Sequence, residues 1–146
     1  METQQDPEFL NLDLDVESTS DLTDLANSLE GRLFVLYCGE NGAGGYRASF
    51  EVDPRVELPH NPTSCSEFIV KCIESLTPEL RALWNGATSR VFDFGYGSGI
   101  VPPPYPIKEG RTLNVHRTEL SSKLVTLISS LNGSIHITIY PFQPSA

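Results

Sequence analysis

Residues 118–133 carry the pattern that most constrains the fold, because their apolar side chains recur at the spacing of one helical face. Thr118 is the expected N-cap of this helix. Asn132-Gly133 supplies the left-handed residue that commonly ends a helix. The segment predicts a helix over 119–131 whose buried stripe is Leu120, Leu124, Leu127, Ile128 and Leu131.

Strand-like segments flank this helix on both sides. After it, isoleucines alternate with polar residues over 135–139, which is the period of a strand with one buried face. Before it, residues 112–116 have the same character. The segment 112–140 therefore predicts a strand, a helix and a second strand in succession.

An earlier segment, 10–37, has the same order of strand, helix and strand. A duplicated β-α-β unit explains this likeness, and so does the frequent use of Gly between a helix and a strand, so both readings stay open. The identical positions are Leu22, Leu25, Ser28, Leu29 and Gly31, which match Leu124, Leu127, Ser130, Leu131 and Gly133.

The remaining chain predicts further strands and helices around these units. Strict alternation predicts strands over 10–16 and 46–52, and apolar runs predict strands over 33–38 and 90–96. The run 33–38 is apolar on both faces, which is typical of a strand covered on both sides or central in the sheet. Helices are expected over about 21–29, 64–76 and 78–84, with Ser64 and Glu67 forming a capping box.

This order of elements predicts one α+β domain over residues 1–146. The expected fold is a largely antiparallel sheet with helices packed on one face. Its first six elements follow the ferredoxin-like βαββαβ order, and an extra βαβ unit follows them.

Several classes of protein are not expected from this composition. The sequence has no apolar run of 18 or more residues, so we expect no membrane span. The N-terminus METQQDPEF lacks the basic and apolar regions of a secretory signal, so we expect a cytoplasmic protein. The cysteines, Cys38, Cys65 and Cys72, lie in apolar runs and are expected to be reduced thiols of the core.

No residue pattern predicts catalysis or a cofactor. The glycines at 95, 97 and 99 precede prolines where a nucleotide-binding helix would have to begin. His60, His116 and His136 are too scattered to predict a metal site. Asp93 lies between aromatic residues, where its pKa could rise, but an alternating strand places it on the solvent side. We therefore expect a protein that is not an enzyme and that binds no cofactor.

The net charge of −9 is concentrated at the start of the chain. Residues 1–31 hold nine acidic residues and no Lys or Arg, whereas the rest of the chain is neutral. This distribution argues against direct binding of nucleic acid, because phosphates need basic partners. An acidic strand face formed by Asp13, Asp15 and Glu17 is either a solvated surface or a binding site for a basic protein.

Two stretches, LWNGATSRVFDFGYGSG at 83–99 and LNGSIHITIYP at 131–141, carry a resemblance to known proteins. They resemble small uncharacterised bacterial proteins of the immunity type, which are encoded beside polymorphic toxins. GRLFVLYCG and ASFE, at 31–39 and 48–51, resemble them more loosely. The resemblance implies a cytoplasmic protein that neutralises a toxin by binding it, and it assigns no site residues.

Charge and resemblance together favour an inhibitor that occludes the active site of a cognate toxin with a basic surface, such as a nucleic-acid-directed enzyme. Glu51, Tyr37 and Tyr105 are further candidates for the interface. The alternative is a ferredoxin-like small-ligand or regulatory module that acts as a homo-oligomer through a sheet edge. The expected partner-binding residues are Asp13, Asp15, Glu17, Asp21, Asp24, Glu40, Tyr46 and Tyr96.

Overall fold

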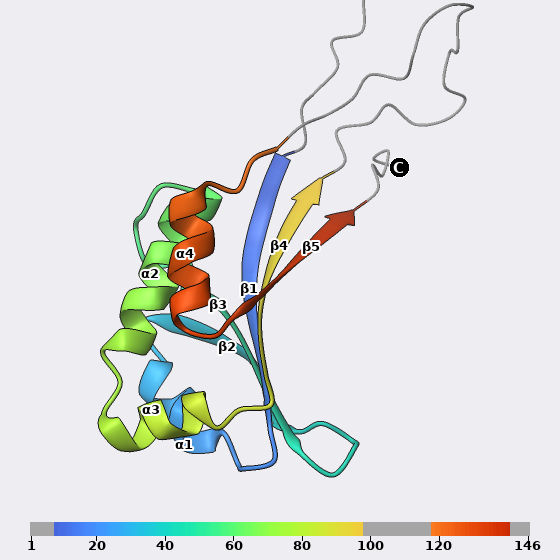
Figure 1. Cartoon of the computed structure of the whole chain (residues 1–146), viewed down its shortest axis with the longest axis vertical. Coiled ribbons are helices and arrows are strands. Elements are labelled where there is room, and N and C mark those ends of the chain that lie inside the picture. The colour runs from blue at the N-terminus through green and yellow to red at the C-terminus, as the bar shows by residue number, and fades with distance from the viewer. Residues whose placement is uncertain (1–7, 98–117, 141–146) are drawn as a thin grey trace, which may run out of the picture.

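A computed structural model describes residues 8–97 and 118–140 of the chain (Figure 1). The expected strand at 112–116 lies outside these residues. The described elements are β1 (Glu8–Ser18), α1 (Thr23–Leu29), β2 (Leu33–Glu40), β3 (Tyr46–Val52), α2 (Pro62–Glu74), α3 (Pro78–Asn85), β4 (Ser89–Gly97), α4 (Ser122–Ser130) and β5 (Ser134–Tyr140).

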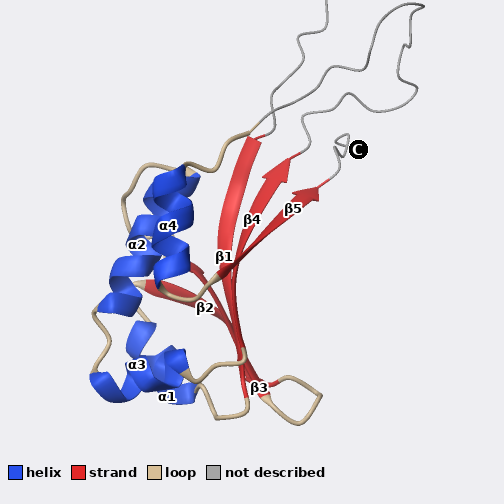
Figure 2. Ribbon diagram, in the orientation of Figure 1, coloured by secondary structure: helices blue, strands red, loops and turns tan. Residues whose placement is uncertain are grey.

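The five strands form one sheet in the order β2-β3-β1-β4-β5. β1 pairs antiparallel with both β3 and β4, and β2 pairs antiparallel with β3. β5 pairs parallel with β4, so α4 lies in the connection between two adjacent parallel strands. The expected α+β fold with a largely antiparallel sheet is confirmed. Figure 2 shows the four helices on the same side of this sheet.

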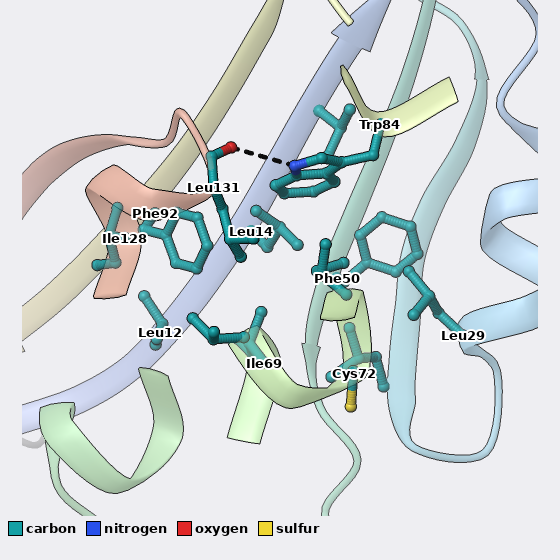
Figure 3. Packing of buried hydrophobic residues seen from close by; sticks show 14 of the residues in the cluster. Leu12, Leu14, Leu29, Phe50, Ile69, Cys72, Trp84, Phe92, Ile128 and Leu131 are labelled. Atoms are coloured by element: carbon teal, nitrogen blue, oxygen red, sulfur yellow. Dashed lines mark hydrogen bonds between the residues drawn. The ribbon is translucent and has the colours of Figure 1, made fainter. Parts of the chain in front are cut away.

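The central strand β1 shows how alternation in the sequence becomes two faces of the sheet. Leu12, Leu14 and Val16 are buried beneath the helices. Phe50 of β3 and Phe92 of β4 lie directly opposite Leu14 and are fully buried with it. This row of apolar side chains forms the middle of the core, and Figure 3 shows it in contact with side chains from the helices.

Helix α4 is close to its predicted position but begins later. The side chain of Ser121, not Thr118, accepts the hydrogen bond of the Leu124 amide and caps the helix. Asn132 has a φ of 57°, as expected of the stop after a helix. In the predicted stripe, Leu124 is fully buried, whereas Leu127 is only half-buried against the core.

Trp84 at the end of α3 joins the two ends of the helical layer. Its indole N–H donates a hydrogen bond of 3.1 Å to the carbonyl oxygen of Leu131, which Figure 3 shows as a dashed line. Because the ring is fully buried, this bond satisfies a polar group that would otherwise be costly to bury. Nearby, the Arg90 guanidinium donates to the carbonyl oxygens of Trp84 and Ala87.

Two predictions about local structure differ from the observed fold. Helix α2 begins at Pro62 rather than Ser64, because Asn61 is the N-cap and accepts from the Ser64 amide at 2.8 Å. β2 is an edge strand with exposed side chains on one face, so the prediction of a strand covered on both sides or central in the sheet was wrong. Phe34 and Tyr37 are about half exposed on its uncovered side.

The thiols of Cys65 and Cys72 are buried in α2 and free, as predicted. Burial raises the pKa of both thiols, which keeps them protonated at neutral pH. Cys38 on β2 is free and only partly buried.

Candidate protein-binding face

The side of the sheet opposite the helices has no covering element among the described residues, and we call it the open face (Figure 2). Its members follow from the alternation of each strand and from the pairing between strands. They include Asn11, Asp13, Asp15 and Glu17 on β1, Arg47, Ser49 and Glu51 on β3, Val91, Asp93 and Gly95 on β4, His136, Thr138 and Tyr140 on β5, and Phe34 and Tyr37 on β2.

Four carboxylates gather at the centre of the open face, and we call Asp13, Asp15, Glu51 and Asp93 the acidic cluster. Asp13 lies directly opposite Glu51 on β3 and directly opposite Asp93 on β4. Like charges at directly opposed positions repel one another. The cluster therefore stores unfavourable electrostatic energy in the middle of the sheet.

The pKa of Asp13 reflects its partial burial as well as this repulsion. Partial burial, together with the charges of Glu51, Asp15 and Asp93, raises its pKa from 3.8 to about 6. The Asn11 amide donates a hydrogen bond of 3.0 Å to the Asp13 carboxylate and opposes the shift only in part. A cation placed over Asp13 would relieve the repulsion.

Two other carboxylates of the cluster, Asp15 and Asp93, have side-chain partners. Asp15 accepts from the Ser49 hydroxyl and lies 3.2 Å from the Arg47 guanidinium. The Thr138 hydroxyl donates to Asp93 at 2.7 Å. Arg47 is the one cation in an ion pair with the cluster in the part of the chain that the structure describes. The open face therefore keeps a negative charge.

Aromatic side chains flank the acidic cluster on both sides. Phe34 and Tyr37 on β2 are 49% and 46% exposed, and Tyr140 on β5 is 48% exposed. The Tyr140 ring lies against Gly95, because a Cβ at that glycine would be 3.2 Å from Tyr140 Cε2 and would clash with the Asn11 side-chain oxygen. Exposed aromatic side chains beside a charged centre are typical anchors of protein interfaces.

The predicted acidic residues separate into two groups in the structure. Asp13, Asp15 and Glu17 lie on the open face, as the alternation of β1 requires. Asp24 belongs to the first turn of α1, in the helical layer, and Asp21 lies just before this helix. Asp21 accepts from the amide and the hydroxyl of Thr23, at 2.8 and 2.6 Å, and these bonds lower its pKa.

The other predicted residues do not join the acidic cluster. Glu40 and Tyr46 lie opposite each other near the β2–β3 turn, on the same side of the sheet as the buried Ala48. Tyr96 is 2% exposed and packs edge-on against Phe9, with ring centroids 5.8 Å apart. Its burial leaves no surface for a partner. Tyr105 lies outside the described residues.

The predicted partner-binding residues did not include Asp93, Phe34 and Tyr140 of this face. Only the alternation of Asp93 with Phe92 and Phe94 indicated its side of the strand. Its position next to Asp13 depends on the pairing of β1 with β4, which no local pattern encodes. Glu51, named as an additional candidate, lies directly beside Asp13.

A hollow of about 220 Å³ lies between the start of β1 and the first turn of α2. Leu12, Val52, His60 and Cys65 are among its lining residues, and His60 Nε2 is 3.2 Å from the carbonyl oxygen of Phe9. Residues 8–97 and 118–140 contain no group of three or more His, Cys, Asp or Glu side chains that could hold a metal ion. They also contain no helix long and apolar enough to span a membrane.

Comparisons of the chain with protein-family models, curated proteins and solved structures find no match. A functional proposal therefore depends on the chemistry of the open face and on the resemblance noted in the sequence.

Proposed function

We propose that this protein is an inhibitor of the immunity type, which binds a cognate toxin through the open face and occludes the toxin's active site. The observation that carries the proposal is the acidic cluster, in which four carboxylates lie together on the open face and only Asp15 has an ion-paired guanidinium among the described residues. The partner that fits is a protein with a basic surface, such as a nucleic-acid-directed toxin. In this role the protein acts in the cytoplasm, has no enzymatic activity and needs no cofactor.

Electrostatic energy supports this choice of partner. Partial burial and repulsion within the acidic cluster raise the pKa of Asp13, and Lys or Arg side chains of a partner would offset that repulsion on binding. An active site that binds nucleic acid presents basic side chains at the spacing of phosphates. Neighbouring strands lie about 5 Å apart. Carboxylates on these strands can therefore bind the basic side chains in place of phosphates.

The aromatic flanks support a protein partner in preference to a free ion. Phe34 and Tyr37 on one side of the cluster and Tyr140 on the other are each about half exposed. Aromatic side chains contribute much of the energy at protein interfaces, and a polar centre between them gives specificity. A small cation would need only the carboxylates.

We also propose the ferredoxin-like arrangement for the segment from β1 to β4. The strand order β2-β3-β1-β4, with every neighbouring pair antiparallel, supports this arrangement. α4 and β5 then extend the sheet beside β4. A duplication relating 10–37 to 112–140 stays a proposal, because residues 112–116 lie outside the described residues.

The alternative function, a module that binds a small ligand, has less support. The hollow beside α2 holds about 220 Å³, which falls below the roughly 300–1,000 Å³ of typical ligand sites. Its lining comes from β1, β3, α2 and the loop before α2, and its polar side chains are those of Asn11, Glu51 and His60 beside the Cys65 thiol.

The experiment compares two variants that lose the same charge at different places. One carries Asp13→Asn, Glu51→Gln and Asp93→Asn on the open face. The control carries Asp24→Asn, Glu74→Gln and Glu79→Gln, at exposed positions of the helices. Binding kinetics are measured against the toxin encoded by the neighbouring gene. We expect the open-face variant to associate at least about tenfold more slowly, and the control to keep most of the wild-type rate.

Equal losses in the two variants would show that net charge acts without a defined site. If neither variant associates more slowly than wild type, the open face is not part of the interface.

A further inference from the structure

β5 leaves one free edge at the end of the sheet. The strand pairs with β4 on one side, and its other side has no strand beside it among the described residues. Ile137 and Ile139 point to the helical side, in register with Phe94 and Tyr96, but they are 51% and 65% exposed. Large apolar side chains beside an unpaired strand edge favour pairing with another strand.

Helix α4 continues this surface above the strand. The Lys123 ammonium group lies 2.7 Å from the Glu67 carboxylate of α2, which shows the side of α4 that faces α2. Val125 and Ser129, four residues apart, lie on the opposite side of the helix and are exposed. They therefore face outward on the side of the free edge, and we call β5 with this side of α4 the β5/α4 edge.

The β5/α4 edge has almost no charge. From Leu124 to Tyr140 the sequence contains no Asp, Glu, Lys or Arg, although the whole chain has a net charge of −9. Proteins commonly protect a free strand edge with a charged side chain, a bulge or a proline. β5 has none of these, and its pairing with β4 is regular along all seven residues.

The opposite edge of the sheet is protected. β2 has a bulge between Val35 and Tyr37, and a bulge turns a strand edge away from incoming strands. The Tyr37 hydroxyl also donates to the carbonyl oxygen of Glu40, across the end of the strand. The two edges therefore differ in kind, although both carry exposed apolar residues.

We propose that the β5/α4 edge binds a second copy of this chain, so that two β5 strands pair antiparallel across a twofold axis. Antiparallel pairing keeps the helices of both copies on one side of a continuous sheet, so the two α4 helices become neighbours. Val125 and the small Ser129 then allow these helices to approach closely. The open faces lie together on the other side and stay free.

The sequence of β5 suits pairing with itself. A twofold axis at Ile137 places Ile135 of one copy opposite Ile139 of the other, and Ile137 opposite itself. β-Branched side chains at directly opposed positions stabilise antiparallel pairs. The net charge also favours a second copy as the partner of this edge. Two chains of net charge −9 repel each other, and this repulsion is weakest when they approach through a surface without charged side chains.

The experiment is sedimentation equilibrium of the full chain between roughly 1 and 100 μM, where weak specific association becomes visible. We expect a dimer. Ile137→Lys and Val125→Lys should each weaken dimerisation at least about tenfold, because each buries an unpaired ammonium group. Val125 lies on a helix surface, so this variant tests the interface without changing β5. Phe34→Lys on β2 is the matched control and should leave dimerisation unchanged.

A monomer over the whole concentration range would overturn the proposal and would favour residues 112–116 of the same chain as the occupant of this edge. A loss of dimer in Phe34→Lys equal to that in Ile137→Lys would overturn it as well, because it would assign the interface to β2.

Discussion

At the scale of single residues, Asp13 connects folding and binding. Its strand position fixes its neighbours, since Glu51 and Asp93 lie directly opposite and Asp15 is two residues along β1. Partial burial and these charges raise its pKa to about 6. The native protein therefore accepts a cost in stability when Asp13 is ionised, and a basic partner would lower that cost.

The raised pKa predicts how stability depends on pH. Between about pH 4 and 6, native Asp13 holds its proton more tightly than Asp13 of the unfolded chain. The native state is therefore favoured at low pH, and this contribution is lost as the pH rises through 6. The free energy of unfolding of Asp13→Asn, measured relative to that of wild type, should therefore rise by about 1–2 kcal/mol between pH 4 and pH 7. This figure allows for solvent screening.

Urea denaturation of both proteins across this range gives the measurement. Both proteins keep the charged and titratable neighbours of Asp13, which are Arg47, Glu51, Asp93 and His136. The difference in free energy of unfolding between them therefore reports mainly on position 13. Asp24→Asn, which removes the same charge at an exposed position of α1, is the matched control. A difference for Asp13→Asn that stays constant with pH would contradict the prediction.

At the scale of elements, α4 and β5 show what local pattern specifies. The apolar stripe of α4 packs against β5 and α2, and Leu124 is fully buried. Gly133 permits the close approach after the helix, because a Cβ there would be 2.8 Å from atoms of both Ile128 and Phe92. The helix stop and the strand pattern thus fix this corner of the core.

Deletion of core side chains tests this packing. Leu124→Ala should lower the free energy of unfolding by roughly 2–5 kcal/mol, because it removes a fully buried side chain and leaves a cavity. Leu127→Ala should cost less, since Leu127 is half-buried at the margin of the core. Thermal or urea denaturation of both variants measures the difference. A larger loss for Leu127→Ala would mean that α4 is rotated from the observed position.

Sequence patterns predicted the elements better than their surroundings. The strict alternation of β1 identified its buried and acidic faces, because that signal is local. The exposure of Phe34 was not predicted from the sequence. Whether β2 is covered depends on the order of the strands in the sheet and not on the residues of β2 itself. The caps shifted to Ser121 and Asn61 because several suitable side chains lie near each helix start, and backbone geometry selects one.

The candidate site shows the same limit. Asp13, Asp15 and Glu17 were found from alternation, whereas the addition of Asp93 required the pairing of β1 with β4. Asp21 and Asp24 are close in sequence to the acidic strand, but the chain turns into the helical layer before them. Proximity in sequence therefore predicted too large an acidic surface at the end of β1 and too small an acidic surface at the centre of the sheet.

At the scale of the whole molecule, two surfaces of opposite character lie on different sides. The open face has the acidic cluster, and the β5/α4 edge has no Asp, Glu, Lys or Arg. A basic partner is attracted to the first by charge. A second copy reaches the second only against the repulsion between two chains of net charge −9. Salt should therefore act on the two associations in opposite directions.

Raising NaCl from about 0.1 M to 1 M shortens the screening length from about 10 Å to 3 Å. Toxin association should slow markedly, because steering by the acidic cluster is screened, while the dissociation rate changes less. Dimerisation should strengthen over the same range, because screening reduces the repulsion between copies while the apolar contacts persist. Surface-plasmon kinetics of the toxin complex and sedimentation equilibrium of the free protein measure the two responses. A dimer that weakens with salt would place charged groups in its interface and exclude the β5/α4 edge. A toxin on-rate that does not change with salt would exclude the open face as the toxin-binding surface. Each of these two results would leave the proposal for the other surface unaffected.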